Sequence, residues 1–322
     1  MARGYLPPAM SPLLVLIVAV LATTYAGPVI RLAAAPALAI AFWRLALVLP
    51  VTGAAAAREI RLSPGPRPGD SPGGRSGAVP GDPLGAALPL MALSGLALAI
   101  HFWTWIASLK YTSVASSVVL VSLKPVFAWW IAALWLREHP TRRERWGILL
   151  AVGGAILIGV ADAGASVGAL SGDVLALVGA LAAACYYVIG RRVRAHVGVW
   201  SYATVVYAIA AAALAGLAVG SGVAFTGYAR SDWAVFVALA AGPMLVGHTG
   251  LNYALKHFRA TTVNVAALGE PVGATLLAWL IPAIHEVPAP LALAGDILTL
   301  VGIGLALTSG GEQADVPSGL AG

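Results

Sequence analysis

The sequence predicts an all-α membrane protein with ten transmembrane helices, arranged as two inverted five-helix repeats. Three observations support this fold class: the composition, a series of long apolar stretches, and an internal duplication. Hydrophobic residues make up 60% of the 322 residues, charged residues only 10%, and the mean hydropathy is +0.88. An ordinary soluble domain carries about 25% charged residues, so the composition excludes that class.

Apolar stretches of about 20 residues recur along the chain, each long enough to cross a hydrocarbon core of roughly 30 Å as a helix. The first stretch is longer than the apolar core of a signal peptide and further stretches follow at once, so we interpret it as a retained helix. The predicted spans are 12–33, 36–55, 85–108, 112–136, 144–163, 170–190, 200–220, 233–254, 260–283 and 289–309.

Two segments lack this apolar character. Residues 62–83 are rich in Pro, Gly and Ser, which predicts a flexible cytoplasmic loop, and residues 310–322 predict a disordered tail. The remaining chain forms a first five-helix repeat at 12–163 and a second, inverted repeat at 170–309. Cys185 is the only cysteine and lies in an apolar stretch, so it supports neither a disulfide framework nor a thiolate metal site.

The distribution of Lys and Arg predicts the orientation. With a cytoplasmic N-terminus, 14 of the 19 Lys and Arg residues flank the spans on the inside and three on the outside, while Arg44 and Lys124 lie within spans. The positive-inside rule therefore predicts a multi-pass protein of the plasma or inner membrane with both termini in the cytoplasm. Because the basic residues are divided among short loops, they form no nucleic-acid-binding patch.

Two near-copies of one tripeptide indicate the duplication. Lys124-Pro125-Val126 and Glu270-Pro271-Val272 lie 146 residues apart, each inside an apolar run. At this offset, eight of the 26 residues at 109–134 are identical to those at 255–280. Each repeat contains five predicted spans, an odd number, so the second repeat inserts upside down relative to the first. Inverted repeats are typical of secondary transporters, which bind substrate near the midplane between the repeats.

Polar residues lie at similar depth in several spans. An unpaired charge at the bilayer centre costs roughly 2.5 to 3.5 kcal/mol even on a lenient insertion scale, so such residues face partners, water or substrate. Spacing by four residues places Trp105 on the face of one histidine and Asn252 on the face of the other. We therefore expect these faces to line one aqueous cavity. The charged residues and histidines are Arg44, His101, Lys124, His248 and Glu270.

Each of these residues also has a structural interpretation. Arg44 is either a cation capped by backbone carbonyls or a substrate ligand. Lys124 and Glu270 have no obvious partner on their own helices, so we expect them to interact, either as a fixed ion pair or within a substrate site. His101 and His248 are either hydrogen-bonded packing residues or proton carriers.

Glycine and proline positions predict packing and helix geometry. Gly147 with Gly154, and Gly295 with Gly302, form stripes seven residues apart in the fifth and tenth spans. Small residues let helices approach closely in a membrane, so we interpret the stripes as packing seams. The prolines of the two tripeptides predict kinks that free backbone carbonyls.

Four segments carry a family resemblance: PALAIAFWRLAL (36–47), HFWTWIASLKYTSVASSVVLVSLKPVF (101–127), GILLAVGGAILIG (147–159) and GHTGLNYALKHFRATTVNVAALGEPVGA (247–274). They resemble the EamA-type transporters of the drug/metabolite transporter superfamily, and the similarity covers about residues 12–309. Arg44 matches the arginine common in the second helix of that family. The lysine before Pro125 departs from the uncharged residue often found there.

The resemblance implies a ten-helix inverted-repeat exporter of amino acids, metabolites or drugs, often driven by a proton or solute gradient. In that family, helices 1, 3, 4, 6, 8 and 9 mainly line the cavity. The matching positions here are Tyr25, His101, Trp105, Lys124, Tyr187, His248, Asn252 and Glu270.

A secondary transporter accounts for the duplication, the loop asymmetry and the central charges together. The chain contains no HExxH motif, phosphate-binding loop or other cofactor or metal motif, so we predict that it is neither an enzyme nor a nucleotide-driven pump. Two central cations against one carboxylate favour a small amino acid or organic anion as the substrate, with protonation of Glu270 as a means of coupling. The resemblance implies that this substrate is exported, and the inverted repeats imply alternating access. The alternatives are an exporter of lipophilic cations and a non-transporting structural membrane protein.

Overall fold

The structure, a computed structural model, describes residues 11–62, 83–111, 117, 120–161, 170–280 and 287–309. Every regular element within these residues is a helix. The α-helices and the two π-helices, η1 and η2, are α1 Pro12–Thr23, α2 Ala26–Arg31, α3 Ala37–Ala46, α4 Leu49–Leu62, α5 Pro83–Tyr111, α7 Lys124–Ile131, η1 Ala132–Leu136, α8 Arg142–Ala161, α9 Leu170–Arg194, α10 Val199–Gly220, α11 Arg230–Leu239, η2 Ala240–His248, α12 Thr249–Ala254, α13 Ala260–Ala266, α14 Gly269–Leu280 and α15 Pro290–Ser309.

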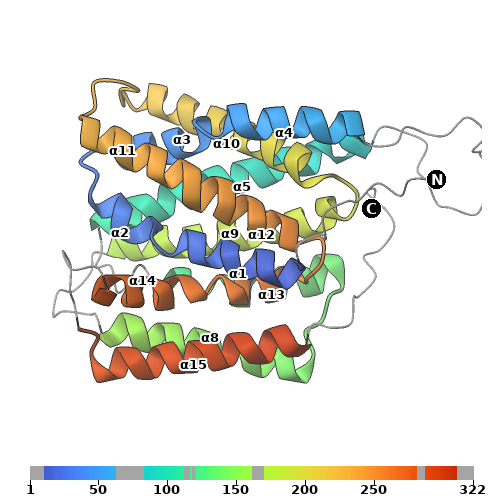
Figure 1. The fold of residues 1–322 in the computed structure, drawn as a ribbon, viewed down its shortest axis with the longest axis vertical. Helices are drawn as coiled ribbons and strands as arrows, with labels where there is room; N and C mark the ends of the chain where they lie inside the picture. The colour runs from blue at the N-terminus through green and yellow to red at the C-terminus, as the bar shows by residue number, and fades with distance from the viewer. Residues whose placement is uncertain are drawn as a thin grey trace, which may run out of the picture.

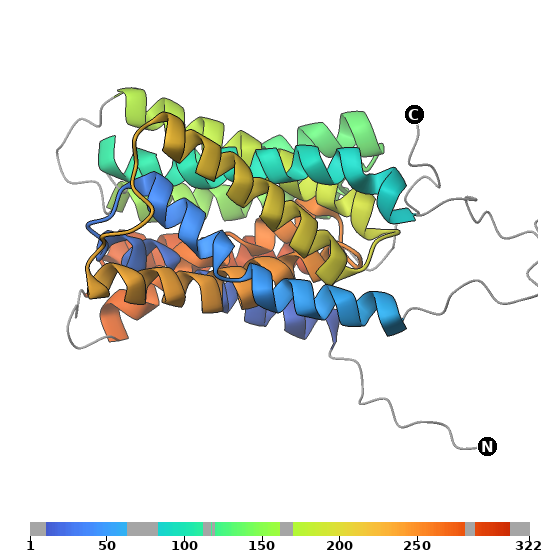
Figure 2. The ribbon, with the colours of Figure 1, turned by 90° about the horizontal axis from the view of Figure 1, so that it is seen from above.

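The helices lie side by side with their axes along one common direction (Figures 1 and 2). Helix α1 begins and helix α15 ends at the same end of the bundle, on the right in Figure 1. Seven segments of the described chain are long and apolar enough to cross a membrane, in agreement with a multi-pass membrane protein. They are Pro12–Ile30, Ala37–Leu62, Leu84–Tyr111, Leu170–Arg194, Val199–Gly220, Arg230–Ala254 and Pro290–Thr308.

These seven segments overlap seven of the predicted spans. The other three predicted spans overlap α7 with η1, then α8, and then α13 with α14. Helix α4 continues to Leu62, past the end of the second predicted span. Its final residues, Arg58-Glu59-Ile60-Arg61, include strong helix formers that extend the helix beyond the apolar stretch. Most of the predicted loop at 62–83 and the tail at 310–322 lie outside the described residues.

Four helical segments are interrupted in the middle of the bundle. The turns fall at 24–25, 47–48, 122–123 and 267–268. At the last two, short turns close through hydrogen bonds from Leu123 N to Leu120 O (3.2 Å) and from Leu268 N to Val265 O (2.9 Å). Pro125 and Pro271 then lie in the first turn of the next helix, where a missing N–H costs no helical hydrogen bond. The prolines therefore begin new helices instead of kinking continuous ones.

The two glycine stripes pack against each other, which confirms the predicted seams. Helices α8 and α15 lie side by side at the lower edge of Figure 1. A Cβ atom built on Gly147 would lie 2.8 Å from Gly302 O, and one built on Gly154 would lie 2.5 Å from Gly295 O. The converse distances are equally short, so the two backbones touch along the seam and only glycine fits there.

Replacing Gly154 with alanine should destabilise this seam. The added methyl would lie 2.4 Å from Thr299 Oγ1 and 2.5 Å from a backbone carbonyl, which cannot move aside. Overpacking of this kind costs about 1 to 3 kcal/mol, so the midpoint of thermal unfolding of the purified protein in detergent should fall by several degrees. Gly153→Ala is the matched control, because its methyl meets only Leu298 Cδ2 at 3.9 Å. Equal unfolding midpoints for the two variants would contradict the seam.

Candidate functional site

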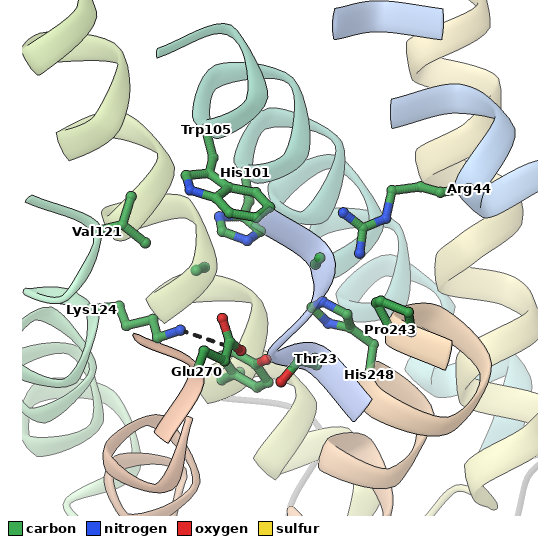
Figure 3. Close-up of a pocket in the computed structure, with 12 residues that line it drawn as sticks. Thr23, Arg44, His101, Trp105, Val121, Lys124, Pro243, His248 and Glu270 are labelled. Carbon is green, nitrogen blue, oxygen red and sulfur yellow. Dashed lines mark ion pairs between the residues drawn. The ribbon is translucent and has the colours of Figure 1, made fainter. Parts of the chain in front are cut away.

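A small cavity lies in the middle of the bundle, beside the interrupted helices (Figure 3). The volume of the cavity that the centre of a water molecule can occupy is about 20 Å³. Seven of the nine residues predicted from the sequence line it: Arg44, His101, Trp105, Lys124, Tyr187, His248 and Glu270. Elements from both halves of the chain thus contribute to one polar site.

Lys124 and Glu270 face each other across the cavity, as the duplication predicts. Lys124 Nζ lies 3.9 Å from Glu270 Oε1, and their side chains are 8% and 26% exposed. Each residue lies in the first turn of a helix that begins after a turn. The positive end of a helix macrodipole favours a carboxylate and disfavours an ammonium group, so Lys124 requires a nearby anion more than Glu270 requires a cation. At 3.9 Å the two groups attract each other without a direct hydrogen bond.

Arg44 reaches the cavity from α3 on the opposite side (Figure 3). It is only 1% exposed, and its Cζ lies 4.0 Å from the centroid of the Phe102 ring, a cation–π contact. Within the described part of the chain, its Nε and Nη1 atoms have no hydrogen-bond partner. The interpretation as a cation fully capped by carbonyls does not fit these two atoms. Buried N–H groups without acceptors are costly, so this guanidinium is suited to receive an acceptor inside the cavity.

The two histidines lie on different walls. His101 Nδ1 lies 2.9 Å from Gly179 O, so Nδ1 carries the hydrogen and a neutral ring keeps Nε2 as an acceptor. The ring of Trp105 stacks on His101 with centroids 6.0 Å apart and an angle of 4°. The His248 ring meets Phe102 edge to face at 5.0 Å, and its Nδ1 finds no acceptor or donor among the described residues.

Asn252, one of the two remaining predicted residues, does not line the cavity. Its fully buried amide bonds the hydroxyls of Tyr186 at 2.7 Å and Tyr207 at 3.3 Å. The spacing from His248 is regular, because Asn252 lies in the α-helix that follows it, but the buried amide turns to hydroxyl partners on neighbouring helices. Tyr25 is also absent from the lining, and its hydroxyl donates to Ala238 O at 3.1 Å.

Five further lining residues were not predicted from the sequence. They are small or weakly polar, and no charge or motif distinguishes them from the rest of an apolar helix. Thr23 shows the difficulty, because its hydroxyl donates to Val20 O of its own helix, as buried threonines commonly do. The five residues are Thr23, Ala26, Val121, Ala183 and Pro243.

Comparisons with known proteins agree with this architecture. The model of the EamA-like transporter family matches residues 10–160 and again residues 170–308. A solved crystal structure, described only as that of a protein, is similar with a TM-score of 0.72 and 20% sequence identity. The match covers 92% of this chain and 98% of that chain, and at this identity it supports the fold alone. No curated protein matches the sequence. Because the family model covers most of the sequence, the chain belongs to the EamA-like transporter family, whose members are membrane transporters and not enzymes.

Proposed function

We propose that this transporter is a secondary active exporter of a small metabolite that carries a carboxylate, such as an amino acid or an organic anion. One observation carries the proposal: the guanidinium of Arg44, buried at the cavity, has two nitrogen atoms, Nε and Nη1, without acceptors among the described residues. A carboxylate provides two acceptor oxygens and a negative charge, and a guanidinium can bind it along one edge, for example through Nη1 and Nη2, in a bidentate, charge-assisted manner.

The balance of charge in the cavity supports the same substrate class. Arg44 and Lys124 supply two positive charges and Glu270 one negative charge, so the lining has an excess of about +1 when the histidines are neutral. An anion or a zwitterion bound through its carboxylate would neutralise this excess. The stacked His101 and Trp105 rings offer an apolar wall for the rest of the molecule.

The proposal includes ten membrane spans in two inverted five-helix repeats, at 12–163 and 170–309. Its support is that the family model matches the chain twice, once in each half. In addition, Lys124 and Glu270 lie in the first turns of α7 and α14, which follow equivalent turns, and the two residues are 146 positions apart. Interrupted helices that meet near the midplane are the usual setting for a transporter site.

Alternating access would require this conformation to open. A cavity of about 20 Å³ has room for one or two water molecules and not for a metabolite. Ion pairs join the two halves outside the cavity: Glu138 with Arg191, at 3.0 Å, and Glu144 with Arg259, at 2.6 Å. Both lie in segments that the positive-inside rule assigns to the cytoplasmic side, so opening on that side would break them.

We also propose that both termini are cytoplasmic and that the protein lies in the cell membrane. The support is the excess of Lys and Arg on one side of the predicted spans. Cysteines introduced at Ser71 and Ser171, after replacement of Cys185, test this orientation. Only the cysteine at position 171 should react with an impermeant reagent added to intact cells. Reaction at position 71 from outside would contradict the orientation.

Proton coupling is the part of the proposal that concerns Glu270. Protonation of its carboxyl group would raise the positive excess of the cavity and favour carboxylate capture, and ionisation would favour release. The side chain is 26% exposed and lies 3.9 Å from Lys124. Its carboxylate could therefore interact in turn with the lysine, with a proton and with the amine of a substrate.

A transport assay in proteoliposomes tests the function directly. A carboxylate-bearing amino acid and an organic acid are compared with a lipophilic cationic dye, with protein-free liposomes as the control. We expect movement of at least one carboxylate compound and none of the dye. Dye efflux that depends on Glu270, with no movement of anions or zwitterions, would support the competing cation exporter. Comparing the medium of cells that overexpress or lack the protein then identifies the exported compound.

A further inference from the structure

A chain of hydrogen bonds runs behind the cavity through fully buried side chains. Tyr186 Oη bonds Asn252 Oδ1 at 2.7 Å, and Asn252 Nδ2 bonds Tyr207 Oη at 3.3 Å. Tyr207 Oη in turn bonds Thr249 Oγ1 at 3.1 Å, and that hydroxyl donates to Met244 O at 3.2 Å. The chain therefore joins α9, α10 and α12 to a backbone carbonyl of η2.

The chemistry of the groups gives this chain a single direction. A carbonyl oxygen only accepts, so Thr249 is the donor to Met244 O and must accept from Tyr207. The oxygen of Tyr207 is then the acceptor for the Asn252 amide, whose own oxygen accepts from Tyr186. Every hydroxyl in the chain donates once, and successive bonds polarise one another in the same sense.

The chain of hydrogen bonds ends at the π-helix η2, whose turns contain more residues than those of an α-helix. In η2 the backbone N–H of Thr249 also bonds Met244 O, five residues earlier, so this carbonyl receives both the amide and the hydroxyl of the same threonine. π-Helical turns are rare and are frequently found at functional sites. The residue directly before Thr249 is His248, which lines the cavity, and Pro243 of the same turn lines it as well. The hydroxyl thus stabilises the turn that holds two cavity residues.

We propose that Tyr207 is a positioning residue for the cavity, which it does not line: its hydroxyl, through Thr249, holds the π-helical turn that places His248 beside Phe102 and the substrate. The expected effect on transport rests on the proposed function, whereas the structural link between Tyr207 and His248 rests on the hydrogen bonds. Two neighbours strengthen the link. The Phe102 ring lies between Arg44 and His248, and the Tyr186 ring lies 6.3 Å from the His248 ring.

Tyr207→Phe tests the proposal, and the same helix supplies a matched control. Tyr202 is equally buried on α10, and its hydroxyl bonds Ser94 Oγ at 2.6 Å, away from the cavity. We expect Tyr207→Phe to raise the apparent KM for the carboxylate substrate about fivefold, the effect of one lost buried hydrogen bond. Tyr202→Phe loses a comparable bond and should leave the KM unchanged. Equal KM values for the two variants would overturn the proposal.

A double substitution separates positioning from general packing. Thr249→Val breaks the next bond of the chain, so it should raise the KM as Tyr207→Phe does, and the double variant should be no worse than either single variant. Thr249→Ser keeps the hydroxyl and should behave as the wild type. Multiplied effects in the double variant, or a serine variant as impaired as the valine variant, would refute a shared chain. If Tyr207→Phe does not fold, the threonine variants decide the outcome.

A measurement without substrate distinguishes failure of this inference from failure of the proposed function. With Cys185 replaced by alanine, a cysteine introduced by His248→Cys reports the accessibility of the cavity wall to a small thiol reagent. Tyr207→Phe should change the initial labelling rate about fivefold, and Tyr202→Phe should not. Unchanged labelling in both would overturn the positioning role, whatever the substrate. A wild-type protein that moves no carboxylate compound would overturn the proposed function alone.

Discussion

Replacing Arg44 with glutamine should lower kcat/KM for a carboxylate substrate by at least about a hundredfold, because it removes two charge-assisted hydrogen bonds of roughly 1.5 to 3 kcal/mol each. Stability should be maintained or should rise, since the substitution also removes a buried charge whose Nε and Nη1 lack partners in the described chain. Arg44→Lys should retain part of the activity, because an ammonium group keeps the charge but not the bidentate geometry.

The appropriate control is an arginine in a similar contact elsewhere. Arg192 lies with its Cζ 5.0 Å from the centroid of the Trp135 ring, and it does not line the cavity. Arg192→Gln should therefore leave kcat/KM near the wild-type value. Initial rates in proteoliposomes, corrected for the amount of folded protein, give the comparison. Wild-type transport by Arg44→Gln, at wild-type abundance, would remove the main support for a carboxylate substrate.

Neutralising either Lys124 or Glu270 should lower transport at least tenfold, because each change leaves the other charge without its partner in a mostly buried site. Exchanging the two charges, as Lys124→Glu with Glu270→Lys, should partly restore transport. Both positions lie in the first turn of a helix, so in either arrangement one carboxylate has a favourable interaction with a helix dipole and one ammonium group an unfavourable one. The total electrostatic energy therefore changes little.

A second ion pair between the two halves provides the reference for this experiment. Arg191 and Glu138 are more deeply buried, but they lie outside the cavity and Arg191 also donates to two backbone carbonyls. If neutralising Arg191 or Glu138 lowers transport, exchanging the two residues should not restore it. A carboxylate at position 191 cannot donate hydrogen bonds to the two backbone carbonyls that Arg191 binds. Transport by each single and double variant is measured together with its abundance in the membrane. Single neutralisations at the cavity that transport normally would refute the functional coupling.

The sequence predicted the charged part of the cavity well. Charges in apolar helices are rare and costly, so Arg44, Lys124 and Glu270 could be recognised without knowledge of the fold. The 146-residue offset then indicated that two of them belong to equivalent positions, and the structure places these two 3.9 Å apart.

The rest of the site depends on contacts that local sequence does not reveal. The turn at 24–25 contains no proline or glycine, and Thr24 there packs against Gly273, where a Cβ atom would lie 2.2 Å from the threonine side chain. Asn252 was assigned to the cavity by its spacing from His248, but its amide is bonded to the hydroxyls of Tyr186 and Tyr207, which the local sequence does not reveal. Val121 and Ala183 line the site only because of how their helices pack, and no property of these side chains predicts it.

The glycine seam between α8 and α15 restricts how this molecule can change shape. Because backbone meets backbone at Gly147, Gly154, Gly295 and Gly302, a slide of one residue, about 1.5 Å along the axis, would drive larger neighbours into spaces that hold only a hydrogen atom. These two helices come from different halves of the chain, yet their close backbone contacts prevent them from sliding along each other. Any widening of the cavity that keeps this seam intact must therefore come from movements of the interrupted helices, while α8 and α15 stay together as one unit.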